Sequence, residues 1–378
     1  METSMIGDYG TWAAGLRKGG LIPSPHHLND IKDFARWRLW ARELVLERMA
    51  PPAIAKPASV RTVATQRYEG LDIELLQWDL GYGRPTEAVM LKPAGAIGRL
   101  PGIMALHCHG GKKYWGLRKI ARFEPVHPLM REHQEQYYGG RAWANEIARR
   151  GYVVLVSDSF TFGSRRVRPE ECSPEVRGQA KDGADDNPAS IDAYNKWAGE
   201  HENIMAKSLF CAGTTWPGVF WAEDKAALDV LAGRDDVDAK RIGCAGLSGG
   251  GLRTDFLAGL DERIACSVSV GFMTTWTDFL LNKCHTHTWM AYLPRISTDL
   301  DFGQILGLRA PKPTMVQNTT EDKLYTLGEV HKSQALLEEM FAHAGAPEKF
   351  QFKYYPGPHQ FDATMQEDAF AWLDRWLK

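Results

Sequence analysis

The sequence RIGCAGLSGGG, residues 241–251, is an apolar run that ends in a serine flanked by glycines. Arg241–Ala245 predicts a buried strand, and a helix is expected from about Gly249. Gly246–Gly250 joins the two elements as a G-x-S-x-G motif, which in a strand–turn–helix context places the serine hydroxyl at the carboxyl edge of a sheet. A Cβ at either flanking glycine would clash in so tight a turn. The strained backbone would therefore present Ser248 at the surface of that edge.

Strand and helix patterns alternate on both sides of this turn. Strands are predicted at 60–65, 71–78, 87–92, 102–106, 152–157, 264–270, 314–317 and 350–355, and helices at 142–150, 220–231, 327–344 and 363–377. The first strands are joined by short turns, which favours an antiparallel start. The later strands are continuously apolar and separated by helices, which is typical of a parallel sheet covered on both faces. We therefore predict an α/β fold with one mostly parallel central sheet.

Two regions lie outside this alternation. Residues 1–58 read as an N-terminal helical appendage, with a helix that Asn29 or Asp30 could cap and that Pro51-Pro52 ends. Residues 59–378 form the predicted catalytic domain, interrupted at about 160–218 by a long polar segment with many aromatic residues. Loops of that length are usually functional or disordered. We interpret it as a partly ordered insertion over the site that influences substrate choice, and call it the excursion.

Composition excludes several functional classes. The 378 residues are 44% hydrophobic and 24% charged, with a net charge of −2, so nothing indicates nucleic acid or an anionic membrane as a partner. No apolar stretch reaches the roughly 18–20 residues of a membrane span. The first twenty residues lack the apolar core of a signal peptide, and six scattered cysteines fit a reducing compartment. We expect a cytoplasmic enzyme acting on a small molecule; the sequence leaves homo-oligomerisation open.

A serine nucleophile needs a base and a residue that orients the base. His359 lies between the last strand and the last helix, which places it at the same carboxyl edge as Ser248. Asp322 follows the strand at 314–317 and precedes His359 in the chain, and the order Ser, Asp, His suits the motif. Glu321 is adjacent and Asp278 follows another strand, so both stay open as alternatives for the acid.

An oxyanion site combines the N–H that follows the nucleophile, here of Gly249, with one from an earlier strand-end loop. Leu106–Gly111 is that loop. Its His-Cys-His sequence and the Cys284–His287 cluster also raise a zinc interpretation. Ligand types two apart in an extended segment, with no second cluster at finger spacing, make a poor zinc site. We therefore expect no metal, and the absence of nucleotide motifs indicates no other cofactor.

From about residue 60 to its end the chain resembles the α/β-hydrolase superfamily, in the branch with acetyl xylan esterase-like and dienelactone hydrolase-like proteins. Besides the serine motif, the segments that carry the likeness are 106–111, 158–165, 237–243 and 308–313. The resemblance implies a triad of Ser248, Asp322 and His359. It also implies that His109 or Gly110 joins Gly249 as oxyanion donor, although Cys108 stands where many relatives have glycine. The excursion has no counterpart that we can assign.

These observations predict a serine hydrolase that cleaves a carboxylic ester of a carbohydrate or another small alcohol. Tryptophans could stack on such a substrate, although most tryptophans fill cores and interfaces. Those in segments near the predicted site, and so the candidate substrate contacts, are Trp216, Trp276 and Trp289, with Trp221 beside them. A peptidase or amidase of the same fold is the alternative among enzymes. A non-catalytic binding protein with this fold is the alternative from another class.

Overall fold

The computed structural model describes residues 4–7, 9–16, 33–183 and 187–378. Nine strands form one sheet in the order β1-β2-β3-β5-β4-β6-β7-β8-β9. The strands are β1 Val60–Tyr68, β2 Leu71–Trp78, β3 Thr86–Pro93, β4 Leu100–Leu106, β5 Val153–Ser157, β6 Val237–Leu247, β7 Ile264–Val270, β8 Thr314–Thr319 and β9 Phe350–Tyr355. Each predicted strand is present, and the largest difference is that β6 begins four residues earlier.

The sheet changes from antiparallel to parallel pairing at β5. The pairs β1–β2, β2–β3 and β3–β5 are antiparallel, whereas the pairs β5–β4, β4–β6, β6–β7, β7–β8 and β8–β9 are parallel. Parallel neighbours bring the carboxyl ends of β4, β6, β7 and β8 to one edge. The predicted mostly parallel sheet with an antiparallel start is confirmed.

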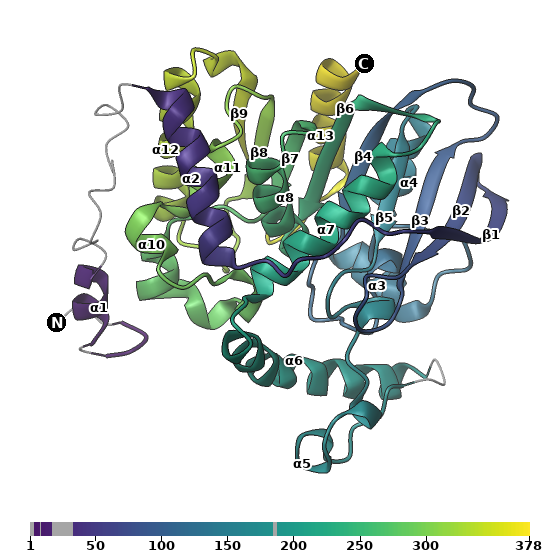
Figure 1. Cartoon of the computed structure of the whole chain (residues 1–378), viewed down its shortest axis with the longest axis horizontal. Coiled ribbons are helices and arrows are strands. Elements are labelled where there is room, and N and C mark those ends of the chain that lie inside the picture. The colour runs from purple at the N-terminus through teal and green to yellow at the C-terminus, as the bar shows by residue number, and fades with distance from the viewer. Residues whose placement is uncertain (1–3, 8, 17–32, 184–186) are drawn as a thin grey trace.

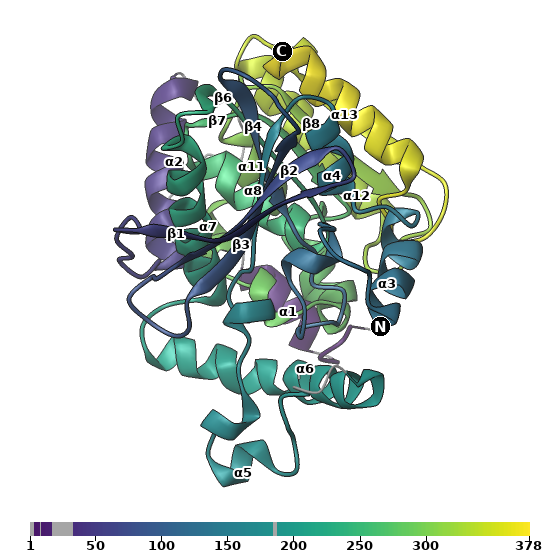
Figure 2. The same ribbon diagram turned by 90° about the vertical axis from the view of Figure 1, so that its right-hand side faces the viewer.

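Helices cover both faces of this sheet (Figures 1 and 2). The α-helices are α1 Tyr9–Leu16, α2 Phe34–Met49, α3 Pro128–Tyr138, α4 Trp143–Arg149, α5 Pro174–Arg177, α6 Pro188–Cys211, α7 Trp216–Ala232, α8 Gly249–Leu260, α9 Trp276–Asp278, α10 Ile296–Asp299, α11 Phe302–Gly307, α12 Leu327–His343 and α13 Ala363–Leu377. One large apolar cluster packs α2, α7, α8 and α11 against one face of the sheet, which we call the first face. A second cluster packs α4 and α13 against the other face. The core thus has two layers of side chains, one on each side of the strands.

The N-terminal helix α2 belongs to this core. Its side chains Trp37, Ala41 and Val45 share the apolar cluster of the first face. Asp33 caps the helix by accepting a hydrogen bond from the N–H of Arg36. The predicted caps, Asn29 and Asp30, lie outside the described residues. At the other end, before Pro51-Pro52, the hydroxyls of Thr214 and Thr215 donate to the carbonyls of residues 50 and 49, which satisfies two terminal acceptors.

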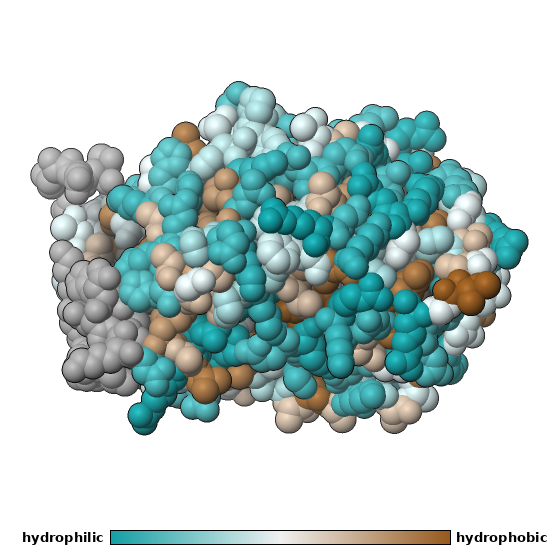
Figure 3. All heavy atoms as spheres, turned by 90° about the horizontal axis from the view of Figure 1, so that it is seen from above, coloured by the Kyte–Doolittle hydropathy of each residue, from teal (hydrophilic) through white to brown (hydrophobic). Residues whose placement is uncertain are grey.

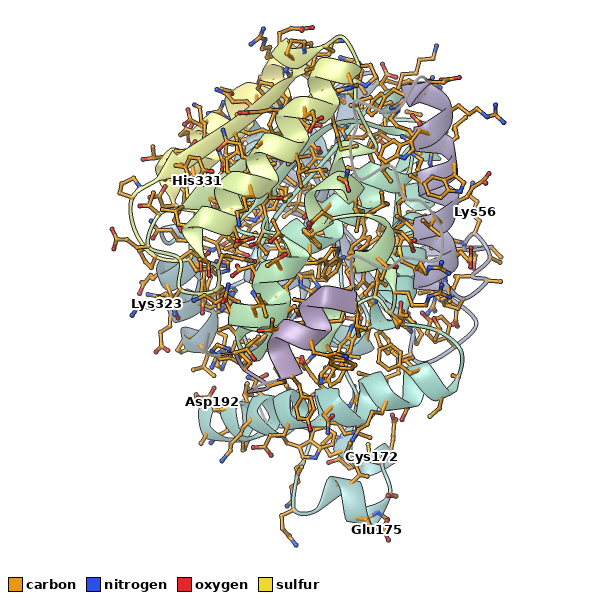
Figure 4. The ribbon with its side chains drawn as sticks, turned by 90° about the vertical axis from the view of Figure 1, so that its left-hand side faces the viewer. Lys56, Cys172, Glu175, Asp192, Lys323 and His331 are labelled. Atoms are coloured by element: carbon orange, nitrogen blue, oxygen red, sulfur yellow. The ribbon has the colours of Figure 1, made fainter. Side chains whose placement is uncertain are left out.

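The excursion holds a helix that the sequence interpretation missed. Its main element is α6, 24 residues long, which Asn187 caps through the N–H groups of residues 189 and 190 and which has proline at its first position. Before α6 the chain projects around α5, and we call residues 169–183 the tip. Figure 4 shows Cys172 and Glu175 of this tip on the side of α6 away from the sheet.

The face of the molecule opposite α6 and α5 is mostly hydrophilic, and its apolar residues form small, separate groups (Figure 3). Among the helices of the described residues, none combines the length and the apolar character needed to cross a membrane.

Candidate active site

Ser248 lies at the sharp turn between β6 and α8. Its φ is 59° and its ψ is −121°, a strained conformation for a residue with a side chain. A Cβ on Gly246 would lie 2.5 Å from the carbonyl oxygen of Leu106, and one on Gly250 would lie closer still to the same atom. The steric reason predicted for the two flanking glycines is therefore confirmed. The strand end of β4 packs so tightly against the turn that only glycine fits at either position.

His359 and Asp322 form a short hydrogen bond, with 2.6 Å between Nδ1 of the imidazole and Oδ2 of the carboxylate. The other carboxylate oxygen accepts from the N–H of Leu324 at 2.9 Å, which fixes the Asp322 side chain. Nε2 of His359 is buried and has no hydrogen-bond partner among the described residues. His359 and Ser248 line the same cavity of about 170 Å³. An imidazole held in this way can accept a proton at Nε2.

The two alternative acids lie elsewhere. The side chain of Glu321 is exposed, and its backbone N–H donates to the carbonyl of Gly357. Asp278 is fully buried, where its carboxylate accepts from Thr274, Asn282 and the N–H of Thr326. Of the three candidate acids, the structure brings Asp322 to His359.

The cavity wall beyond Ser248 is largely apolar. Its apolar side chains are Leu247 at the end of β6, Phe272, Met290 and Ala291 from the segment that follows β7, and Leu324 from the β8–α12 loop. His287 also lines the cavity, but its Nε2 donates to the carbonyl of residue 324 at 3.0 Å. Burial lowers the pKa of His287 to about 4, so this imidazole is neutral at pH 7. The wall therefore suits a small uncharged group.

The predicted oxyanion loop lies beside the turn. Gly249, His109 and Gly110 all line the cavity with Ser248. A Cβ on Gly249 would lie 2.9 Å from the backbone nitrogen of His109, so the two segments are in close contact. Gly249 is the first residue of α8, and its N–H has no acceptor within the helix. The structure thus brings the three proposed donors to one place.

The metal interpretations are not supported by the positions of the ligand types. His107 Nδ1 donates to the carbonyl of Cys108 at 3.1 Å, whereas His109 Nε2 bonds Glu202 at 2.6 Å. In the second cluster His285 contacts the sulfur of Met5 and His287 the carbonyl of residue 324. Within the described ranges, no group of three or more His, Cys, Asp or Glu side chains converges on a point that could hold a metal.

The structure places the three predicted substrate-binding tryptophans away from the cavity wall. Trp216 is 2% exposed beneath the ammonium of Lys113, and Trp276 is 5% exposed and packs edge-on against Phe302. Trp289 is 37% exposed and faces Phe210, although its neighbours in sequence line the cavity. The structure therefore does not bring these three predicted substrate contacts to the cavity. Two of these indoles bury their large apolar area in the core, where that area is most stabilising.

Sequence reasoning missed the charged side chains behind the oxyanion loop. Glu202 of α6 bonds His109 and also pairs with Lys113 at 2.8 Å. Burial raises the pKa of Glu202, but Lys113 and His109 outweigh it and lower the pKa to about 2. Lys119 is fully buried nearby. The cap and proline at the start of α6 could have revealed the helix, but no local pattern indicates that residue 202 meets residue 109.

We compared the sequence and the structure of this chain with those of known proteins. No protein-family model matches the chain. The chain is 25% identical over 325 residues, 85% of its length and 94% of the other, to the Bacillus subtilis (strain 168) protein named "Putative hydrolase YtaP". A crystal structure described as a "putative acetyl xylan esterase" from Bacteroides fragilis NCTC 9343 covers 93% of this chain and 83% of its own, with TM-score 0.69 and 17% identity.

A glucuronoyl esterase from Solibacter usitatus covers 90% of this chain and 92% of its own, with TM-score 0.58 and 15% identity. At these identities the solved structures establish the fold. Together with the sheet order and the sharp turn at Ser248, they show that the chain has the α/β-hydrolase fold.

Proposed function

We propose that this α/β-hydrolase-fold chain is a serine esterase in which Ser248 is the nucleophile, His359 the general base and Asp322 the orienting acid. The observation that carries the proposal is the 2.6 Å bond between His359 and Asp322, beside a cavity that both His359 and Ser248 line. The unpartnered Nε2 of His359 is the atom that would take the serine proton.

The proposed reaction is acyl transfer. The Ser248 hydroxyl attacks the ester carbonyl carbon while His359 accepts its proton, and the tetrahedral oxyanion is held by N–H groups of Gly249, His109 and Gly110. The intermediate expels the alcohol, which takes the proton from the imidazole. Water then attacks the acyl-enzyme with His359 again as base, which releases the acid and restores Ser248. Asp322 stabilises the imidazolium formed in each half of the reaction.

We propose a carbohydrate ester with a short acyl group as the substrate class. The cavity of about 170 Å³ with its apolar wall suits an acetyl-sized group, and a neutral His287 adds no charge to that wall. The names of the two solved structures, an acetyl xylan esterase and a glucuronoyl esterase, point to carbohydrate esters. The cytoplasmic location remains a prediction from the sequence.

The test combines covalent labelling with a substrate panel. A fluorophosphonate should label the wild-type chain at Ser248, and the protein should hydrolyse p-nitrophenyl acetate faster than the octanoate and than aminoacyl-nitroanilides. Ser248→Ala and His359→Ala should each lower kcat by about 10⁴-fold or more, and the double variant should be little slower than either, because the residues act as a unit. Labelling of Ser248→Ala at another serine would refute the assignment, and preferred nitroanilide cleavage would favour an amidase.

A further inference from the structure

Lys119 is a buried cation directly behind the proposed oxyanion loop. It ends a short 3₁₀ helix, Leu117–Lys119, and its side chain is fully buried. Its Nζ donates to two consecutive backbone carbonyls of the loop, that of Cys108 at 2.9 Å and that of His109 at 2.7 Å. One ammonium therefore holds two successive peptide groups.

These two hydrogen bonds determine where the neighbouring N–H groups point. In a planar trans peptide the carbonyl and the N–H of the same unit point in opposite directions. Because the carbonyls of residues 108 and 109 turn towards Lys119, the N–H groups of His109 and Gly110 turn away from it. The nitrogen of His109 faces the serine turn, since a Cβ on Gly249 would lie 2.9 Å from it. Successive N–H groups on one side of the chain form a concave site for an anion.

The charge of Lys119 is not neutralised by a carboxylate in direct contact. Within the described part of the chain no ion pair involves Lys119, whereas its neighbour Lys113 pairs with Glu202 at 2.8 Å. Asp158, whose charge raises the pKa of Lys119, accepts from the N–H groups of Leu117 and Ser164. Burial lowers the pKa of Lys119 to about 7, so the ammonium form predominates below about pH 7. In a poorly hydrated environment such a charge polarises the peptides that it contacts.

We propose that Lys119 is a positioning residue of the oxyanion site. Its ammonium holds the N–H groups of His109 and Gly110 towards the oxygen that becomes negative when Ser248 attacks the substrate, and it strengthens both donors by polarising their peptide groups. The inference rests on the proposed esterase function. It adds a residue that contacts neither the substrate nor the triad.

The role predicts a kinetic effect on the transition state rather than on substrate binding. Deleting a direct oxyanion donor lowers kcat by about 10²–10³-fold. Removing a group that only orients and polarises the donors should have a smaller effect, so we expect Lys119→Met to lower kcat by about 10–100-fold with KM changed less than about threefold. Lys119→Gln keeps a donor without the charge and should lie between Met and the wild type.

The experiment compares these variants with two matched lysines on p-nitrophenyl acetate. Lys112→Met removes a partly exposed lysine that pairs with Asp192, and should leave kcat unchanged. Lys113→Met removes the other buried lysine, which is bonded to Glu202 and Thr161 but not to the loop carbonyls. It should reduce thermal stability about as much as Lys119→Met with a smaller loss of kcat. Equal kcat losses for the two buried lysines would overturn the inference.

A boronic acid, which forms a tetrahedral adduct on the serine, provides a second measurement. Its affinity should fall across the Lys119 variants by the same factor as kcat/KM, because both report the charged tetrahedral state. If folded Lys119→Gln binds the boronate as tightly as the wild type and keeps its kcat, the inference fails while the esterase assignment stands. If Ser248→Ala retains wild-type activity, the esterase assignment itself fails.

Discussion

The loops after β6, β8 and β9 and the excursion at 160–218 reach the same site in different ways. The strand-end loops place Ser248, Asp322 and His359 through backbone packing against the sheet. The described residues of the excursion contribute no side chain to the cavity wall, and its contact with the site is Glu202, which bonds His109 of the predicted oxyanion loop. The proposed reacting groups thus come from the edge of the sheet, whereas the excursion contacts a loop behind them. Its predicted role in substrate choice remains a prediction.

The largest loss of kcat is expected for a substitution in the strand-end loops. Asp322→Asn should lower kcat by about 10³–10⁴-fold, because an amide cannot stabilise the imidazolium and favours the wrong tautomer of His359. The matched control is Glu321→Gln, one residue away and exposed, which should leave kcat within about twofold. Steady-state kinetics on p-nitrophenyl acetate measure both variants. A larger loss for Glu321→Gln would reverse the assignment of the acid.

Packing is tight at the strand-end loops and open in the excursion, and one glycine in each region can test this difference. A Cβ on Gly250 would collide with the carbonyl of Leu106, whereas one on Gly199 of α6 would meet nothing within 4 Å. Gly250→Ala should destabilise the fold by about 1–3 kcal/mol or more through forced backbone shifts and should abolish activity. Gly199→Ala should stabilise it by about 0.5–1 kcal/mol, because alanine favours a helix interior. Urea unfolding compares the two, and equal stabilities would contradict the described packing.

Glu202→Gln tests the contact between the regions. The pKa of Glu202 is about 2 in the folded protein against 4.5 for the free side chain, so its contribution to stability is present above pH 4.5 and is lost as the pH falls through 2. At pH 7 the variant should lose about 1–3 kcal/mol, because Lys113 is left buried without its anionic partner. The difference from the wild type should shrink below pH 4.5. Urea titrations at pH 7 and pH 3 measure it, and a constant difference would contradict the ion pair.

The smallest change in hydrolysis of p-nitrophenyl acetate is expected when the tip is replaced. Replacing residues 169–186 with a short Gly/Ser linker removes α5 but keeps α6 and Glu202. Hydrolysis of p-nitrophenyl acetate should change less than about twofold, because none of the tip residues that the structure describes lines the cavity. Activity on acetylated xylan oligosaccharides, measured beside it, shows whether the tip contacts a longer substrate. A large loss on the small acetate would mean that the tip supports the fold.

Local patterns predicted much of this structure. The sequence correctly predicted the glycines around Ser248, the continuous apolar strands and the helix at 363–377, because each of these features depends on neighbours within a few residues. Helix α6 was missed although its cap and proline are local signals, because its mixed polar and aromatic residues resemble a loop. The helix cap is Asp33 rather than the predicted Asn29 or Asp30.

The sequence by itself determined the strand–turn–helix at Ser248 and the chain order of Ser248, Asp322 and His359, since backbone sterics and hydrophobic periodicity are local properties. Only the tertiary structure decided that Asp322 rather than Glu321 meets His359, because neighbouring side chains in a loop point in different directions. It also buried Trp216 and Trp276 and brought Lys119 and Glu202 to the oxyanion loop. Those contacts join residues up to 93 apart in the chain, and burial makes each depend on what the whole fold packs around it.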